Sequence, residues 1–475
     1  MDFLNLIIDQ GNAYLWGYIL IYGLIALGLY FTVRSGFVQF RLFGEMFRLL
    51  TEKATEKRDR HSTSISSFQA FCISLASRVG TGNLAGVAIA VTVGGPGAVF
   101  WMWVIALIGA GSSFVESTLG QIYKVKDGDG FRGGPAYYIE QGLNNRGLGI
   151  FFSILITISY SLVLNAVQAN TITFAFEEAF GTSRITVGIA IAFFSAVIIF
   201  GGVKRIAKVS EKLVPFMAVV FLAMALFVVL KNITLIPSVI GLIFSSAFGL
   251  EAAVGGGIGA ALMNGIKRGL FSNEAGIGSV PNAAATANVS HPVKQGLIQT
   301  AGVFTDTLVI CTATAFIILV SGVHTSSDLT GIQLTQAAFS SQIGGWANIF
   351  VAISILLFAF SSIIGNYYYG ETNVNFLSTD KIFLLIFRIS VIGMIVFGSV
   401  AKIAIVWNLA DLFIGLMAVI NLIGITLLSK FAFKALKDYL DQKKKGVNPT
   451  FNASKIEGLE NVECWGNDQV NKAQV

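Results

Sequence analysis

Charged residues are scarce in this chain of 475 residues: only 12% are Asp, Glu, Lys or Arg, whereas 54% are hydrophobic. A soluble fold of this size could not bury so much apolar surface, so the composition excludes a soluble domain. It indicates an all-α polytopic membrane protein. The net charge of +6 does not point to a nucleic-acid partner, because the basic residues fall in short loops and in the C-terminal tail.

Cysteine and histidine are rarer still. Cys72, Cys311 and Cys464 are far apart in the sequence and form no disulfide framework or metal-binding spacing. The three histidines fall in predicted loops, and the sequence contains no His-Glu-x-x-His motif and no clustered nucleophile and base. A phosphate-binding Gly-x-x-x-x-Gly-Lys-Ser/Thr element is missing as well. We therefore expect neither an enzyme nor an ATP-driven pump, and no prosthetic cofactor.

Long apolar segments dominate what remains. A helix needs about 20 residues to cross roughly 30 Å of hydrocarbon, and eleven segments approach or exceed this length. They run approximately from 13 to 33, 67 to 93, 96 to 122, 148 to 172, 184 to 203, 211 to 230, 235 to 265, 295 to 321, 343 to 368, 382 to 399 and 404 to 428.

The distribution of lysine and arginine predicts the orientation, because these residues concentrate in cytoplasmic loops. With the N-terminus outside, the predicted outer loops hold only Arg184, Lys231 and Lys402, whereas the inner loops and the tail hold nearly all the others. We expect a multi-pass protein of the cell (inner) membrane with a cytoplasmic C-terminus.

Two of the apolar segments are interrupted. The segment 67–93 contains polar residues and glycines from Ser77 to Asn83, and the segment 235–265 contains a glycine run from Gly255 to Gly259. Because unpaired backbone groups are costly in lipid, paired interruptions are typical of inverted-repeat transporters that bind their substrate near the midplane. Alternatively, the glycines only allow close packing of helices.

Eleven transmembrane helices with two interruptions suggest one N-terminal helix followed by a 5+5 inverted-repeat core, in which the first helix of each half is discontinuous. The predicted boundaries are 1–66 for the peripheral helix and its basic loop, 67–230 for the first repeat, 235–428 for the second repeat and 429–475 for the cytoplasmic tail.

Four motifs carry a family resemblance: residues 79–83 (VGTGN), 94–103 (GGPGAVFWMW), 131–138 (FRGGPAYY) and 269–279 (GLFSNEAGIGS). They resemble the signature of the alanine or glycine:cation symporter family. The resemblance covers nearly all of the membrane region. It implies uptake of small neutral amino acids with sodium or protons, on the inverted-repeat fold of the amino acid-polyamine-organocation type that neurotransmitter:sodium symporters share.

A zwitterionic amino acid needs donors for its carboxylate and acceptors for its ammonium group, and an unwound helix offers both. We assign the carboxylate to the amides of Gly80, Thr81 and Gly82, and the ammonium to the carbonyls of the second interruption. Asn165 and Gln168 share one helix face and either bind the polar end of the substrate or join two helices. The carbonyls assigned to the ammonium group are those of Gly255, Gly256 and Gly257.

Sodium prefers hard oxygen ligands. By resemblance to the sodium-symporter fold, one cation site would lie between the first interruption and a later helix, with the ligands Ser77, Val79, Phe358, Ser361 and Ser362. Alternatively, the two serines are merely bonded to the preceding turn of their own helix. A second site would join the substrate carboxylate to Asn83, Thr305 and Asp306.

Ionisable residues inside the membrane are functional candidates by default. Arg78 stands in the first interruption, and an ion pair with Glu116 or Glu251 would neutralise it. Such a pair acts either as a gate or as a static tie between helices. The segment 269–287 either forms an inner gate or folds back and places Phe271 or Ile277 against the substrate.

These features predict a monomeric secondary symporter that imports alanine, glycine or glutamine with Na⁺ or H⁺ by alternating access, surrounded by membrane lipid. The alternative is an ion or solute channel without coupling. A channel favours a pore-lining ring or a repeated filter loop, and the sequence contains neither.

Overall fold

The computed structural model describes residues 2–52, 65–249 and 257–466. Helices make up most of these residues, and the strands β1 (Val125–Asp127) and β2 (Gly130–Arg132) form one antiparallel hairpin. The helices of the first half include α1 (Asp2–Tyr14), α2 (Ile21–Arg34), α4 (Phe43–Leu50), α5 (Ser67–Arg78), α6 (Val87–Gly94), α7 (Gly97–Ile122), α8 (Pro135–Leu143), α9 (Arg146–Ile156), α10 (Asn165–Phe180), α11 (Arg184–Ile199) and α12 (Gly202–Lys231).

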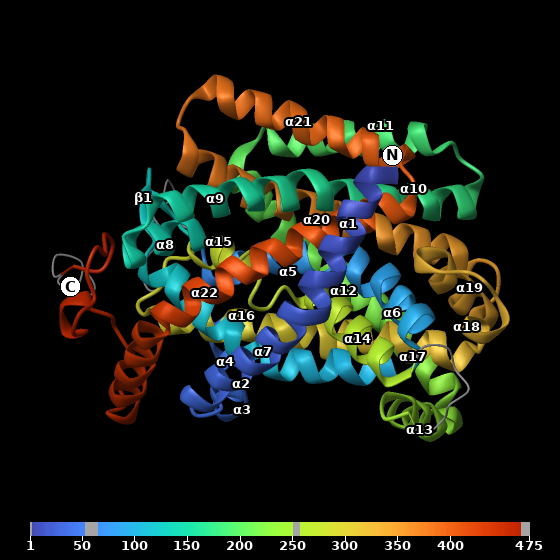
Figure 1. Cartoon of the computed structure of the whole chain (residues 1–475), viewed down its shortest axis with the longest axis horizontal. Helices are drawn as coiled ribbons and strands as arrows, with labels where there is room; N and C mark the ends of the chain where they lie inside the picture. The colour runs from blue at the N-terminus through green and yellow to red at the C-terminus, as the bar shows by residue number, and fades with distance from the viewer. Residues whose placement is uncertain (1, 53–64, 250–256, 467–475) are drawn as a thin grey trace.

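The second half begins with shorter helices and ends with three long ones (Figure 1). The elements used below are α13 (Ile236–Ala247), α14 (Gly257–Asn273), α15 (Val280–Ala284), α16 (Pro292–Val303), α17 (Thr312–Ser321), α18 (Val323–Ser326), α19 (Gly331–Ile343), α20 (Ala347–Leu377), α21 (Lys381–Val400) and α22 (Ile403–Lys444). π-Helical turns lie within several of the longer helical segments, including η2 (Gly82–Gly86), η3 (Thr157–Leu164) and η5 (Phe304–Cys311).

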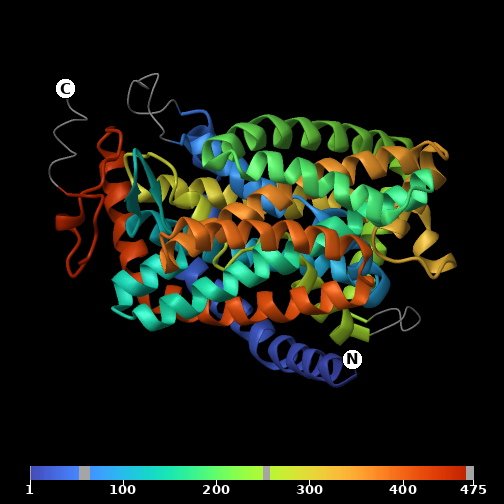
Figure 2. The same cartoon turned by 90° about the horizontal axis from the view of Figure 1, so that it is seen from above.

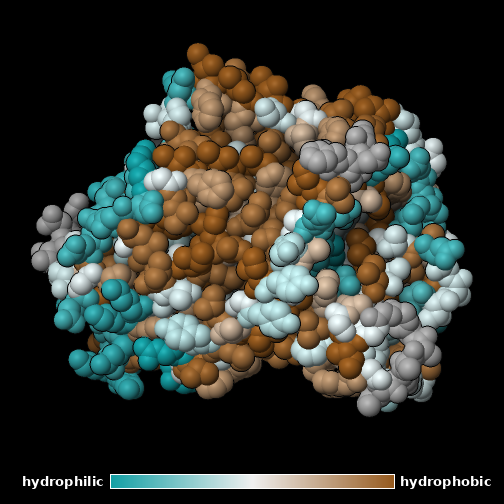
Figure 3. Space-filling model, in the orientation of Figure 1, coloured by the Kyte–Doolittle hydropathy of each residue, from teal (hydrophilic) through white to brown (hydrophobic). Residues whose placement is uncertain are grey.

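The chain is a helical polytopic membrane protein. Eight helices in its described part are long and apolar enough to cross a membrane, and shorter apolar helices accompany them. In the orientation of Figure 1 the long helices run roughly horizontally, and an apolar surface separates polar surfaces at the two ends (Figure 3). We call the end that carries residues 446–466 the tail end, and the end that carries α13, α18 and α19 the far end.

The first apolar segment lies along the outside of the bundle (Figure 2), where α1 packs on α22 and α2 packs on α7. The core places the two interrupted regions close together, since α14 packs on α6 and α15 packs on α5. A capping box starts α5: Ser66 Oγ accepts from the amide of Gln69, and Gln69 Oε1 accepts from the amide of Ser66.

The segment predicted at 235–265 is not one helix. Its described residues belong to α13 and to the beginning of α14, and α14 continues to Asn273. The interruption of the second half lies further along, where α14 ends and α15 begins at Val280. The glycine run dominated the sequence pattern, but Gly255 and Gly256 lie outside the described residues. Gly257 is exposed at the start of α14, 14 positions before Phe271, whose ring lies against Gly82. The described structure therefore does not bring this glycine to the first interruption.

The C-terminal region is more ordered than a solvated tail. The last long helix, α22, was expected to end near residue 428, but it continues to Lys444. The chain then folds back over the tail end, where Phe451, Cys464 and Trp465 are buried.

Candidate functional site

The first interruption is confirmed where the sequence placed it. The helix α5 ends at Arg78, Val79 is extended with φ −81° and ψ 90°, and helical structure resumes at Thr81 and Gly82. The amide of Gly80 donates to Asn83 Oδ1 at 2.9 Å, and the amide of Thr81 donates to Gln168 Oε1 at 3.1 Å. These donors are turned from their own helix toward side chains, so a ligand carboxylate could replace those acceptors.

Two glycines in the interruption allow three other helices to approach it. A Cβ atom at Gly80 would collide with Ser362 on α20 and lie 2.8 Å from Gln168 Oε1 on α10. A Cβ atom at Gly82 would lie 3.2 Å from Phe271 on α14. The glycines therefore serve close approach as well as unwinding. Thr81 Oγ1 is buried here without a hydrogen-bond partner among the described residues.

Asn165 and Gln168 have different roles. Gln168 reaches the first interruption, as described above. Asn165 instead donates to the carbonyl of Ser161 at 3.1 Å and accepts from Asn366 Nδ2 on α20 at 3.1 Å. The interhelical alternative therefore describes Asn165, whereas Gln168 remains a substrate-binding candidate.

A cluster of five oxygen atoms lies between the first interruption and α20. Ser362 Oγ is 2.9 Å from the carbonyl oxygen of Ala76, 3.3 Å from that of Val79 and 3.1 Å from that of Phe358. Ser361 Oγ completes the cluster at 2.8 Å from the carbonyl of Phe358. Four of the five predicted ligands thus lie together, and these neutral oxygens suit a dehydrated sodium ion.

Ser77 does not belong to this cluster. Its hydroxyl oxygen lies 2.8 Å from Glu274 Oε1 and 2.7 Å from Asn366 Oδ1. The carbonyl of Ala76 takes the place that the sequence had assigned to Ser77, because the last turn of α5 directs the Ser77 side chain toward the second interruption.

A second polar cluster surrounds the buried carboxylate of Asp306 in η5. Asn83 Nδ2 donates to it at 2.6 Å, and the hydroxyl groups of Ser272 and Thr307 donate to it at 2.7 and 2.9 Å. Asn83 and Asp306 are therefore together, as predicted. Thr305 is not, since its hydroxyl donates to the carbonyl of Ala301 one turn earlier. Thr307, which lies in the same π-helical segment, supplies a hydroxyl to the carboxylate instead.

The second interruption follows α14. Glu274 adopts φ +56°, which is rare for a residue other than glycine, and Gly276 and Gly278 adopt φ +84° and +92°. The amides of Gly276 and Gly278 donate to the two oxygens of the Glu116 carboxylate at 3.0 and 3.1 Å. Glu116 on α7 thereby holds an unwound loop inside the bundle, and the segment 269–287 folds back, as one of our two alternatives expected.

Arg78 is buried and turned toward α16 and α7. It donates to the carbonyl of Gln299 at 3.0 Å and to Ser113 Oγ at 3.4 Å. Within the described ranges no ion pair joins Arg78 to Glu116, and Glu251 lies outside those ranges. These contacts connect α5 to α16 and α7, as expected if Arg78 links helices in a static way.

A buried ion pair closes the far-end side of the first interruption. Arg268 on α14 donates to both oxygens of Asp411 on α22 at 3.0 and 2.7 Å. The Arg268 guanidinium also lies 4.8 Å from the Trp407 ring centre, and Trp407 stacks on Phe271. The sequence did not single out this pair. The sequence had placed Arg268 in a cytoplasmic loop, because the apolar segment was expected to end at residue 265, but α14 continues to Asn273 and buries it.

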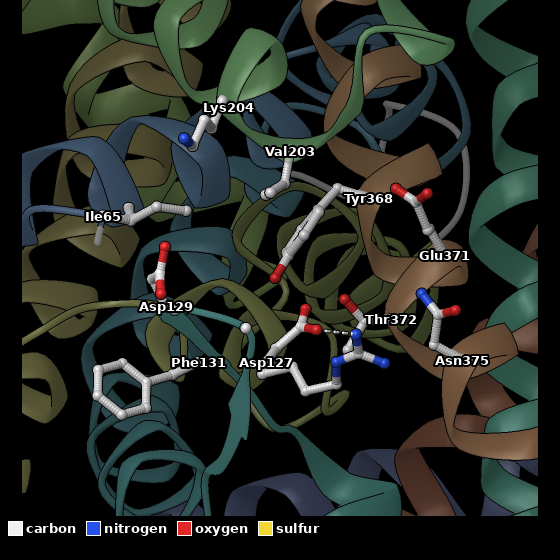
Figure 4. Close-up of a pocket in the computed structure, with 13 residues that line it drawn as sticks. Ile65, Asp127, Asp129, Phe131, Val203, Lys204, Tyr368, Glu371, Thr372 and Asn375 are labelled. Atoms are coloured by element: carbon white, nitrogen blue, oxygen red, sulfur yellow. Dashed lines mark ion pairs between the residues drawn. The ribbon is translucent and has the colours of Figure 1, made fainter. Parts of the chain in front are cut away.

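A polar cavity of about 420 Å³ lies at the tail end. The hairpin, the start of α12 and the last turns of α20 line it (Figure 4). The Tyr368 hydroxyl points into the cavity, and Tyr368 lies two turns beyond Ser361 on the same face of α20. The cavity is therefore on the order of 10 Å from the oxygen cluster along the helix axis.

The amino-acid sequence matches a known protein family. A family model described as the sodium:alanine symporter family matches residues 1–453. The chain belongs to the sodium:alanine symporter family. This match confirms the resemblance seen in the sequence motifs. Members of this family are transport proteins rather than enzymes.

Curated relatives support the same family along the whole chain. The probable sodium/glutamine symporter GlnT of Bacillus subtilis (strain 168) is 58% identical over 97% of this chain and 95% of its own length. The amino-acid carrier protein AlsT of the same organism is 57% identical over 98% and 99%. The sodium/alanine symporter AgcS of Methanococcus maripaludis is 38% identical over 94% and 99%.

A solved structure shows the same fold. The crystal structure of MhsT in complex with L-phenylalanine superimposes with a TM-score of 0.50 and 13% sequence identity. The match covers 80% of this chain and 90% of MhsT. At this identity the likeness concerns the arrangement of helices alone.

Proposed function

We propose that this protein imports a small neutral amino acid together with Na⁺ by alternating access. The observation that carries the proposal is the first interruption, where the Gly80 and Thr81 amides face Asn83 and Gln168 rather than their own helix. The substrate carboxylate would replace these acceptors and bind the amides of Gly80, Thr81 and Gly82.

The substrate ammonium group would face the second interruption, where α14 has ended and carbonyl oxygens are free of the helix. Phe271 lies against Gly82 and stacks on Trp407. These two rings would limit the side chain of the substrate to a small size. Gln168 would offer an amide to a polar side chain, which suits alanine, glycine and glutamine as the substrates to be tested.

The first sodium ion would lie among the carbonyl oxygens of Ala76, Val79 and Phe358 and the hydroxyls of Ser361 and Ser362. These hydroxyls now donate to the carbonyls, and with sodium bound they would turn their lone pairs to the ion. Asp306 and Asn83 would supply a second cation site beside the substrate carboxylate.

Alternating access needs closure on each side of the site. The Arg268 to Asp411 pair would close the outer side, and the polar cavity at the tail end would receive the substrate and cation on the cytoplasmic side. The orientation rests on the charge distribution of the loops, which places the N-terminus outside and the tail inside.

Uptake of labelled alanine, glycine and glutamine into liposomes tests this function. The purified protein would be compared under an inward sodium gradient, an inward proton gradient and no gradient. We expect concentrative uptake with sodium and counterflow with unlabelled substrate inside. Downhill flux with no response to either gradient would instead identify a channel.

A further inference from the structure

The tail-end termini of the two interrupted helices are joined directly to each other. Ile65 stands just before α5, and Ala287 stands shortly after α15. These two residues form an isolated parallel β-bridge, and the amide of Asn288 donates to the carbonyl of Ile65 at 3.0 Å. The half-helices cannot separate at this end while the bridge is in place.

Residues 446–466, which we call the tail segment, pack on the loop that contains this bridge. The amide of Phe451 donates to the carbonyl of Ser290 at 2.9 Å, and Ser290 Oγ donates to the carbonyl of Pro449 at 2.8 Å. The Phe451 side chain lies edge-on against the ring of Trp465, with their centres 5.4 Å apart. Both rings are buried, so docking removes a large aromatic surface from water.

A buried lysine connects the tail segment to the bridge. Lys124 Nζ donates to the carbonyl of Ala287 at 3.0 Å and lies 3.9 Å from the Phe131 ring centre and 4.6 Å from the Trp465 ring centre. Trp465 Nε1 also donates to the carbonyl of Gln121 at 2.8 Å. Burial lowers the pKa of Lys124 to about 7, but the amine can donate to Ala287 in either protonation state.

We propose that the tail segment is a latch that holds the cytoplasmic side of the transporter closed and is released during each transport cycle. The proposal rests on the proposed alternating-access function. Opening toward the cytoplasm requires Ile65 and Ala287 to part, and Trp465 covers the lysine that holds Ala287. Release of Trp465 removes this cover and frees the loop 285–290 to move.

The native cysteine in the tail segment reports on the latch. Cys464 is 2% exposed beside Trp465, so it is protected from a membrane-impermeant maleimide while the tail segment is docked. In inside-out vesicles we expect sodium and alanine together to accelerate labelling of Cys464 roughly fivefold or more, as in a typical coupling between a ligand and a conformational change. The Cys464→Ala variant gives the blank for Cys72 and Cys311.

A second measurement follows how accessible the tail-end cavity is, instead of how accessible the tail segment is. Thr372, which lines the cavity, is replaced by cysteine in the Cys464→Ala background. We expect Trp465→Ala to raise the labelling rate of this cysteine in the absence of substrate. Glu460→Ala is the matched control, because Glu460 is an exposed residue of the tail segment whose side chain forms no hydrogen bond or ion pair with the described residues.

Two results would overturn the latch. The first is that Cys464 stays protected from the maleimide while the same preparation transports amino acid at full rate. The second is a Thr372→Cys labelling rate that is equal in the Trp465→Ala and Glu460→Ala variants. The second comparison needs no substrate, so it separates failure of the latch from failure of the proposed function. If Trp465→Ala does not fold, the labelling of Cys464 in the wild-type chain decides the question.

Discussion

Ser77 and Glu274 stand at the edges of two different helix interruptions, and the Ser77 hydroxyl lies 2.8 Å from Glu274 Oε1. Glu274 Oε2 accepts from Ser279 Oγ at 2.6 Å on the other side of the second interruption. One buried carboxyl group therefore connects the end of α5, the end of α14 and the approach to α15. The two interruptions are therefore in contact through this one carboxyl group.

Glu274→Ala should uncouple the two interruptions. The variant leaves the buried hydroxyl of Ser279 without its acceptor, at a cost of about 1–3 kcal/mol, whereas the Ser77 hydroxyl keeps Asn366 Oδ1 at 2.7 Å. We expect lower thermal stability in detergent and at least a roughly tenfold loss of sodium-driven uptake, because about 1.4 kcal/mol corresponds to tenfold. Glu274→Gln keeps an acceptor and a similar shape, so it should retain more of both. Equal loss in the two variants would contradict this role.

Thr307→Ala and Thr305→Ala form a matched pair on one helical turn. Thr307 donates to the Asp306 carboxylate, whereas Thr305 donates to its own helix. We expect Thr307→Ala to raise the sodium concentration needed for half-maximal uptake by roughly threefold to tenfold, in line with about 0.5–1.5 kcal/mol for one hydrogen bond. Thr305→Ala should leave it nearly unchanged. A larger effect of Thr305→Ala than of Thr307→Ala on this concentration would support Thr305, the ligand expected from the sequence.

The sequence located the first interruption correctly because its signal is local: polar residues and glycines occupy the middle of an apolar segment. It did not locate the interruption at 274–279, because the glycines at 255–259 gave a stronger local signal. Nothing near Glu274 in the sequence reveals that Glu116, 158 positions earlier, supplies the acceptor that stabilises the unwound loop. Long-range hydrogen bonds of this kind decide where a helix is interrupted, and one sequence does not display them.

The same limit applies to single side chains in the cation clusters. Ser361 and Ser362 were predicted as ligands through the resemblance to the sodium-symporter fold, and in the structure both hydroxyls lie beside the carbonyl of Phe358 in the preceding turn of their own helix. The carbonyl of Ala76 lies in the first cluster and the Ser77 hydroxyl does not, and Thr307 contacts Asp306 whereas Thr305 does not. Which of two neighbouring groups faces a cluster depends on the exact rotation of a helix turn. Near an interruption or a π-helical turn that rotation departs from the regular period of 3.6 residues.

Gly82→Ala should impair transport more than Gly86→Ala. A Cβ atom at Gly82 would lie 3.2 Å from the Phe271 ring and from the Ser272 backbone, whereas at Gly86 the nearest atoms are 3.7 Å away. The backbone of Ser272 can yield only if α14 moves, which would disturb the predicted substrate site. We expect reduced uptake of alanine for Gly82→Ala at normal membrane expression. Equal uptake by the two variants would show that this close approach is not needed.

Asp411→Asn should be strongly destabilising. Asp411 is 1% exposed and forms ion pairs with both Arg268 and Lys267, so its neutralisation leaves the buried Arg268 and the partly exposed Lys267 without a counter-ion. Loss of one partner from a buried ion pair costs about 3–5 kcal/mol. We expect a large decrease in the thermal unfolding temperature in detergent. The double variant with Arg268→Gln should recover part of this loss, and the absence of any recovery would argue against the pair as the cause.

His291 should make the tail end sensitive to acid. Burial lowers the pKa of His291 below its usual 6.5, although Asp438 acts in the opposite direction. The unfolded chain therefore binds more protons than the folded chain between the lowered pKa and 6.5, and the free energy of unfolding falls as the pH decreases through this window. Protonation would also remove the acceptor, Nδ1, that the amide of Val293 uses at 3.2 Å.

Thermal unfolding in detergent between about pH 7.5 and about pH 5.5, the range in which histidine titrates, measures this effect. We expect the wild-type protein to lose stability on acidification and His291→Asn to show a smaller loss. His324 is the matched control, because burial also lowers its pKa but it lies at the far end, away from the tail segment. Acidification lowers the thiolate fraction of every cysteine, so labelling of Cys464 is compared with that of a free thiol at the same pH. Relative to this reference, acidification should accelerate labelling of Cys464 in wild-type and His324→Asn proteins, and this relative acceleration should diminish in His291→Asn. An acceleration of the same size in all three proteins would assign the acid sensitivity to another group.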